Sequence, residues 1–317
     1  MFNRRNFLHL STLAGSAAML PPALLTAQFA RAADALAEPL IVQSLNATTA
    51  LISGGACNVL VNKAANGDLL VVDGGHKSGA RELRGTIEDA MGANKITTLV
   101  NTHWHPEQTG LNELLGNSNT RIFAHENTRQ WLGTPIKRLL DDAGYEPLPE
   151  SARPNETFYH YGDFQHGNGA TGSVKVEYGL LRQAHTDGDM YVFLPEANVL
   201  HAGGVLSTDG WPYLDWWCGG WIGGVVDGLE TLLSVANDGT LIIPANGKPI
   251  TKAELQTVHA MYAEIFSSVR GMFVKANTVE QTVAAKPAAQ WESQYGSADA
   301  FITQAHWSLI PHLTPDA

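Results

Sequence analysis

Residues 101–110 read NTHWHPEQTG and carry two histidines, His103 and His105, one residue apart. The apolar, β-branched run directly before them, residues 96–100, predicts a strand. Two imidazoles separated by Trp104 can converge on one metal ion if the backbone turns as it leaves that strand. A His-x-His pair alone is a weak indication of metal binding, because most such pairs are surface or core histidines. The rest of the chain therefore decides how this stretch is interpreted.

A third imidazole is expected from His185, in AHTDGDM, which follows a short polar turn and precedes a strand. Zinc sites take several neutral imidazoles or anionic groups, often from loops at strand ends. The remaining internal histidines are interpreted as hydrogen-bonded or exposed side chains rather than ligands. They are His76, His125, His160, His166, His201, His259, His306 and His312.

The order of apolar patterns predicts a layered α/β fold in a single domain, residues 33–317. Four short antiparallel strands are expected in residues 40–75, then a helix over 78–91 and alternating strands and helices to residue 132. Residues 133–172 are rich in Pro, Gly and Asn and predict an irregular insertion. Further strands follow, then a C-terminal helical tail whose first helix begins at a capping box, Thr251 with Glu254.

The N-terminal 32 residues are interpreted as an export signal rather than part of the fold. Arg4 and Arg5, followed by an apolar stretch and the small-x-small step Ala30-Arg31-Ala32, resemble a twin-arginine signal. A retained membrane anchor is the alternative, but Pro21-Pro22 interrupts the apolar run, so no stable span is expected after signal removal. The sequence therefore predicts a periplasmic protein.

The formal charge of −11 gives no indication of the clustered basic residues that nucleic-acid binding needs. A small-molecule substrate or ligand is expected instead. The sequence identifies no protein partner.

Six motifs in order resemble those of the metallo-β-lactamase superfamily, and most closely its exported members. They are DGG at 73–75, NTHWHPEQTG, AHENTR at 124–129, AHTDGD at 184–189, VLHAGG at 199–204 and IIPANGKPIT at 242–251. This resemblance covers nearly all of the chain after the signal. It implies a four-layer αββα sandwich.

The resemblance also implies metal ligands, residue by residue. The family's first metal is held by three histidines, which match His103, His105 and His185. The positions that hold its second metal carry Glu107, Gln108, Gly204 and Asn246 here. Glu is one methylene longer than Asp, Gln and Asn offer only neutral amide oxygens, and Gly offers no ligand. The expectation is therefore one zinc ion and a degenerate second site.

Three neutral imidazoles suit a catalytic zinc with an open fourth position, and Glu107 is then the candidate residue that orients water or accepts its proton. If Glu107 instead reaches the metal, the site becomes closed and structural. If no metal binds, the chain is a non-catalytic protein that keeps the fold to bind a small molecule or a partner. A two-metal enzyme with substitute ligands is the least expected alternative.

Two further features flank this candidate site. Asp73 matches a family position that braces, through hydrogen bonds, the loop that carries His103 and His105, called the metal loop below. The segment WPYLDWWCGGWIGG, residues 211–224, is rich in tryptophan. Trp211 and Trp216 are expected either to line a substrate cleft or to pack beneath a long loop.

Overall fold

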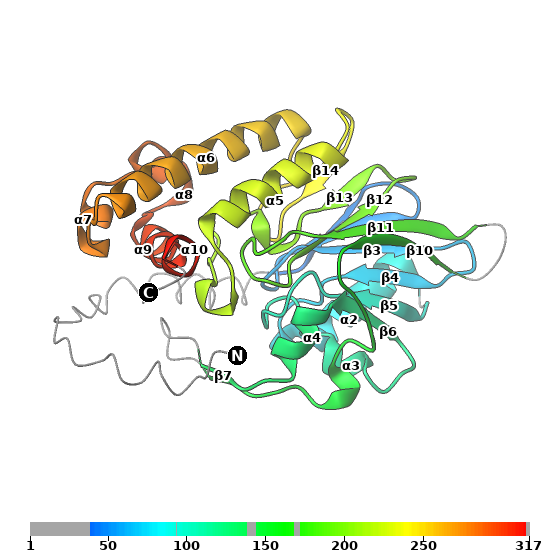
Figure 1. Cartoon of the computed structure of the whole chain (residues 1–317). Coiled ribbons are helices and arrows are strands. Elements are labelled where there is room, and N and C mark those ends of the chain that lie inside the picture. Colours follow the sequence, from blue (N-terminus) through cyan, green and yellow to red (C-terminus); the bar gives the residue numbers. More distant parts are fainter. Residues whose placement is uncertain (1–38, 93, 138–143, 168–171, 315–317) are drawn as a thin grey trace.

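The computed structural model describes residues 39–92, 94–137, 144–167 and 172–314 (Figure 1). The predicted export signal, residues 1–32, lies outside this part of the chain. Within it, no helix has the length and apolar character needed to cross a membrane.

Two sheets form the centre of the molecule. The seven-stranded sheet has the order β1-β2-β3-β4-β5-β6-β9, antiparallel from β1 to β4 and parallel from β4 to β9. Its strands are β1 (Ile41–Ser44), β2 (Thr49–Ser53), β3 (Val59–Lys63), β4 (Leu69–Val72), β5 (Ile96–Val100), β6 (Arg121–His125) and β9 (Glu156–Phe158).

The five-stranded sheet follows chain order from β10 to β14, with only the last pair parallel. Its strands are β10 (Tyr161–His166), β11 (Val174–Leu180), β12 (Met190–Leu194), β13 (Val199–His201) and β14 (Leu241–Ile243). A two-stranded ribbon, β7 (Ile136–Lys137) with β8 (Gly144–Tyr145), lies apart from both sheets.

Alternating side chains on each strand divide the core into layers. In β4, Leu70 and Val72 face the five-stranded sheet, where they meet Val192. Leu69 and Val71 point the other way, into a cluster that includes residues of α2 (Ala80–Met91) and α3 (Asn112–Leu115). The seven-stranded sheet is therefore buried on both faces, which explains its nearly continuous apolar strands.

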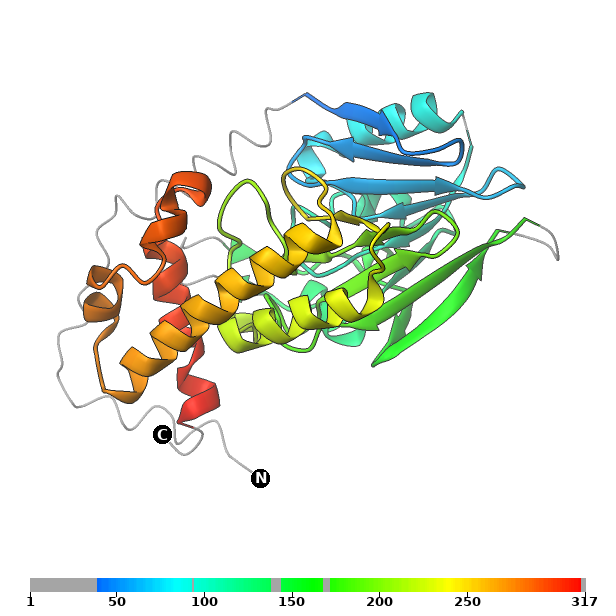
Figure 2. The ribbon, with the colours of Figure 1, turned by 90° about the horizontal axis from the view of Figure 1, so that it is seen from above.

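The opposite layer consists of the long helices α5 (Ile222–Val235) and α6 (Lys252–Val274), together with α9 (Asp299–Ser308). Their apolar side chains form one cluster with the outer face of the five-stranded sheet. Figure 2 shows α5 and α6 side by side, with the shorter C-terminal helices gathered at one end. These are α7 (Val279–Ala284), α8 (Glu292–Tyr295), α9 and α10 (Ile310–Leu313). The four-layer αββα prediction is confirmed.

The predicted strands β1 to β4 and the capping box of α6 are present as expected. The predicted insertion needs correction, because residues 156–166 are not irregular. β9 pairs with β6 in the first sheet, and β10 is the first strand of the second. These strands were missed because they are short and polar: β10 lies at a sheet edge and alternates exposed with half-buried residues up to His166.

Candidate metal centre

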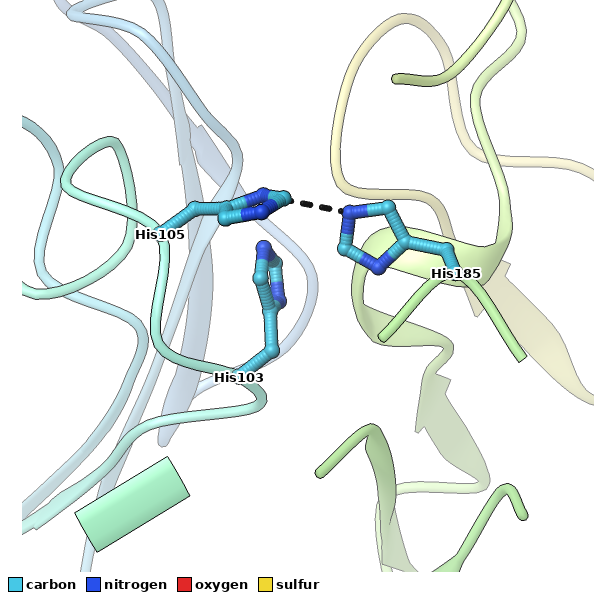
Figure 3. Close-up of side chains that lie close together, drawn as sticks. All are labelled: His103, His105 and His185. Carbon is cyan, nitrogen blue, oxygen red and sulfur yellow. Dashed lines mark hydrogen bonds between the residues drawn. The ribbon is translucent and has the colours of Figure 1, made fainter. Parts of the chain in front are cut away.

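The loops that leave the two sheets bring three histidines together (Figure 3). His103 and His105 lie in the loop after β5, and His185 lies in the loop between β11 and β12. All three are buried, with 1–4% of their surface exposed. One ring nitrogen of each lies within 4.8 Å of the others. The structure thus places the three expected ligands around one point.

The spacing of the nitrogens suits a single ion. His105 Nδ1 lies 3.2 Å from His185 Nε2. Two imidazoles bound tetrahedrally to one zinc at ~2.0–2.1 Å would hold their nitrogens about 3.3 Å apart. The three rings are nearly perpendicular to one another, with interplanar angles of 85–90°. Three imidazole nitrogens within 4.8 Å of one another, two of them at this separation, form a donor set that suits zinc.

Each ring is oriented by a hydrogen bond at its outer nitrogen. His105 Nε2 donates to Asp215 Oδ2 at 3.0 Å, and His185 Nδ1 donates to Asp189 Oδ1 at 2.9 Å. His103 Nδ1 lies 3.0 Å from Thr102 Oγ1. These contacts fix the tautomers and leave His105 Nδ1, His185 Nε2 and His103 Nε2 to face the shared point.

Asp73 acts on this centre through Thr102. Its backbone adopts a positive φ of 64°, and its carboxylate accepts hydrogen bonds from Thr102 N at 2.8 Å and Thr102 Oγ1 at 2.9 Å. Because the Thr102 hydroxyl donates to Asp73, its oxygen is left to accept from the His103 ring. Asp73 thus braces a ligand without contacting the shared point itself.

Asp189 holds the loop that carries His185. Besides the ring of His185, it accepts hydrogen bonds from the backbone N–H groups of His185 and Thr186 and from the Thr186 hydroxyl. Burial raises the pKa of Asp189, but the facing His185 and these donors outweigh that effect, so its pKa is lowered. Asp189 is therefore an ionised group that orients His185.

The electrostatics favour a bound cation. Burial, together with the neighbouring His185 and His105, lowers the pKa of His103 well below its usual value, so the ring stays neutral as a ligand must. Three aspartates, Asp73, Asp189 and Asp215, are at most 1% exposed near these rings. Burial raises the pKa of Asp73 to about 8. A cation among these groups would relieve the cost of burying their charge.

Glu107 lies in the same loop as two of the histidines but outside their cluster. Its side chain is half-buried, and in the described part of the chain the group able to hold an ion consists of the three histidines alone. The geometry is therefore that of a three-imidazole site, not of a closed site with Glu107 as fourth ligand.

The other altered positions do not form a second set of ligands. Gln108 is 3% exposed, and its side-chain oxygen has no hydrogen-bond partner. The amide nitrogen of Asn246, in the orientation that satisfies its neighbours, donates to the carbonyl oxygens of Ala56 at 2.8 Å and Ala245 at 3.1 Å. The side-chain nitrogen of Asn246 is thus hydrogen-bonded to backbone carbonyl groups.

Gly204 lies against the histidine rings. A Cβ atom at this position would lie 2.2 Å from His185 Cε1 and 2.9 Å from His103 Cε1. Non-bonded carbon atoms do not approach this closely, so any side chain at residue 204 would displace a histidine ring. In this chain the space for a ligand at residue 204 is filled by the rings of the first site.

Of the two alternatives expected for Trp211, the structure shows packing beneath the loop rather than the wall of a cleft. Trp211 is only 9% exposed, stacks on Phe301 at 5.1 Å, and donates from Nε1 to Gly296 O. Trp216 is half-buried and contacts Trp217 and Trp307, each with ring centroids 5.7 Å away. The C-terminal helices cover this loop, so both side chains pack beneath it.

A cavity of about 450 Å³ lies beside the metal loop instead. It includes Pro106 and Thr109, which flank Glu107 and Gln108 in sequence, and Tyr145 and Leu148 from the segment after β7. Its lining is His76, Lys77, Ser78, Pro106, Thr109, Gly110, Glu113, Tyr145 and Leu148.

Asp189, Asp215 and Thr102 were not singled out from the sequence as partners of the ligands. Asp189 could have been found, because it stands four residues after His185 within the AHTDGD motif. Asp215 follows the His-x-His pair by 110 residues, in a tryptophan-rich loop with no metal-site pattern. Only the fold brings it to His105.

Comparison with known proteins agrees with this geometry. The family model of the metallo-β-lactamase superfamily matches residues 52–245, well over half of the chain. No curated protein matches the chain. The match includes all three histidines, Asp189 and Asp215, but ends before α6.

Solved structures of this fold are similar despite low sequence identity. A metallo-β-lactamase from Pontibacter korlensis has a TM-score of 0.55 and 16% identity, over 71% of this chain and 99% of its own. A stereoselective inverting sec-alkylsulfatase from a Pseudomonas species has a TM-score of 0.63 and 14% identity, over 84% of this chain and 50% of its own. These likenesses show the fold, and the family model shows that this chain belongs to the metallo-β-lactamase superfamily.

Proposed function

We propose that this chain is a periplasmic hydrolase in which His103, His105 and His185 hold one zinc ion. The substrate is a small molecule with an ester, lactone, amide or similar bond. The observation that supports this most is the 3.2 Å separation of His105 Nδ1 and His185 Nε2, with the outer nitrogen of every ring hydrogen-bonded. Three preoriented imidazole nitrogens form a donor set suited to a catalytic zinc.

A zinc ion held by these three imidazoles would act as a Lewis acid and would lower the pKa of a water molecule bound to it to ≈ 7. The residues around it have separate tasks. Asp189, Asp215 and Thr102 keep the rings oriented, while Glu107 accepts the proton of the attacking water as general base. Glu107 is suited to this task because it is half-buried in the metal loop yet outside the cluster of ligands.

The cavity beside the metal loop supports a small substrate. Its volume of about 450 Å³ lies within the range of small-molecule sites, roughly 300–1,000 Å³. Tyr145 and Leu148 give it an apolar wall. We assign to it the non-reacting part of the substrate.

Export is proposed from the N-terminal sequence alone. Arg4-Arg5 and the following apolar stretch support the twin-arginine route. This route carries folded cargo and so allows the metal to be acquired before export. Replacing both arginines with lysine and measuring the protein in periplasmic and cytoplasmic fractions tests it, since unchanged periplasmic protein would exclude this route.

Metal analysis of protein folded in the cell tests the site. The parent is expected to contain one equivalent of zinc, and His103→Ala and His185→Ala to contain almost none. His160→Ala is the matched control, because His160 is exposed and lies outside the cluster. A parent without metal would support the non-catalytic alternative, and one with two equivalents would support substitute ligands for a second ion.

A further inference from the structure

The loop of residues 207–221 contacts two of the three histidines. Asp215 Oδ2 accepts a hydrogen bond from the ring of His105 at 3.0 Å, and Asp215 N donates to His185 O at 2.9 Å. Asp215 also caps the short helix η5 (Trp216–Cys218) by accepting from Cys218 N at 3.2 Å. The position of this loop therefore affects two ligands at once.

This loop is fixed from outside by helix α9. Leu214 N, directly before Asp215, donates to Gln304 Oε1 at 2.8 Å, and Ile222 N, just beyond the loop, donates to Ser308 Oγ at 3.2 Å. Gln304 and Ser308 are four residues apart and lie on one face of α9. Phe301, one turn earlier on this face, stacks on Trp211 at 5.1 Å. Three successive turns of α9 thus contact the loop.

Gln304 has features of a dedicated contact. Its side chain is fully buried, and its amide nitrogen has no hydrogen-bond partner. Its amide oxygen accepts a hydrogen bond from the backbone N–H of Leu214, the residue before Asp215. The helix that carries it lies 54 residues or more beyond the match to the family model, which ends at residue 245.

We infer that Gln304 is a positioning residue of the metal centre, acting through Leu214 and Asp215 on His105. This inference rests on the proposed function, because it concerns how tightly the three histidines hold zinc. Loss of the Gln304 oxygen leaves a buried backbone N–H without an acceptor, and the chain can restore its hydrogen bond only by moving residue 214. Asp215 then no longer meets the His105 ring in its present geometry.

Three variants of α9 test this. Gln304→Met keeps the length of the side chain but removes the acceptor. Gln304→Glu keeps an acceptor at the same position and serves as the conservative variant. Thr303→Val is the matched control, because Thr303 is also buried and donates its hydroxyl bond to Asp299 O of its own helix. Zinc affinity by competition with a chromophoric chelator, and the visible spectrum of the Co²⁺ form, report on the ligands directly.

We expect Gln304→Met to bind zinc roughly 10–100-fold more weakly, as other changes behind metal-bound histidines do, and to alter the Co²⁺ spectrum. Gln304→Glu and Thr303→Val should keep both properties of the parent, even if Thr303→Val lowers the melting temperature. Parental affinity and spectrum in Gln304→Met would overturn the inference while the proposed function stands. A parent that binds no zinc would overturn both.

Ser308→Ala provides a second test if Gln304→Met does not fold. It removes the hydrogen bond from Ile222 N to Ser308 Oγ at the end of the loop, while Gln304 stays in place. A few-fold weaker zinc affinity is expected. A parental value would overturn the view that α9 positions this loop for metal binding.

Discussion

His105 Nε2 donates to Asp215 Oδ2 at 3.0 Å, although the two residues are 110 positions apart in sequence. Both side chains are buried, with 5% and 0% of their surface exposed. This hydrogen bond turns Nδ1 of His105 toward His185 and His103, and so determines which nitrogen faces the metal position. The bond joins the loop after β5, a strand of the seven-stranded sheet, to the loop between β13 of the five-stranded sheet and α5.

Asp215→Asn should weaken zinc binding roughly 10–100-fold, because the amide keeps the shape but loses the charge behind His105. Competition with a chelator measures this change. Asp227→Asn, at an exposed position of α5, is the control and should bind as the parent does. Equal affinity of Asp215→Asn and the parent would show that the carboxylate charge does not contribute to metal binding.

Gly204→Ala should reduce zinc affinity at least tenfold, because its Cβ would lie 2.2 Å from His185 Cε1. The added methyl should also destabilise the fold by about 1–3 kcal/mol, as in other overpacked cores. Gly271→Ala is the matched control, since a Cβ there meets nothing within 4 Å. Zinc titration and thermal unfolding measure both effects. A Gly204→Ala variant with parental zinc affinity would contradict the close packing of the rings on this glycine.

Much of the fold could be predicted because short stretches of sequence determine the strands and helices concerned. The strands β1 to β4 are short, apolar and separated by turns, and α6 begins at its own capping box. The edge strand β10 was missed because its sequence, YGDFQH, is mostly polar, and its pairing with β11 decides its conformation. Sheet edges depend on tertiary contacts that a local pattern does not contain.

The candidate site likewise has residues that the sequence predicts and residues that only the fold brings together. The three histidines stand in short motifs beside strands, and the order of these motifs along the chain indicates a metal site. The groups behind them are less visible in the sequence: Asp215 meets His105 only in the folded chain, and Gln304 of α9 contacts Leu214, the residue before Asp215. Sequence likewise showed that Gly204 is no ligand, but not that the rings of His185 and His103 occupy the space around it.

Glu107→Gln should lower turnover by roughly 10²-fold or more without loss of zinc, since an amide cannot accept the proton of water. Glu88→Gln, which removes a surface ion pair with Arg84 on α2, is the control and should leave turnover unchanged. Rates on any ester or lactone that the parent hydrolyses, with zinc content measured alongside, test this. Unchanged turnover in Glu107→Gln would remove this carboxylate from the mechanism.

Because His201 is buried without a second proton, the free energy of unfolding should fall at acidic pH. Gly203 N donates to its Nδ1 at 3.2 Å, so the ring carries its proton on Nε2, which lies 3.3 Å from Asn58 O. A second proton would have to displace the Gly203 contact. Burial lowers the pKa of His201 from 6.5 to about 4, although the Asn58 carbonyl partly opposes this shift.

The direction of the effect follows from proton binding. Between pH 6.5 and 4 the unfolded chain binds a proton at residue 201 that the folded chain does not, so stability is complete above pH 6.5 and falls as the pH drops toward 4. From pH 7 to pH 5 this group should cost about 2 kcal/mol of unfolding free energy. Denaturant titrations of the parent and His201→Gln at both pH values, with a chelator present so that zinc release does not contribute, measure the difference. The variant should lose less stability than the parent, whereas His160→Gln, at an exposed site, should follow the parent. An equal loss in parent and His201→Gln would show that another group causes the acid sensitivity.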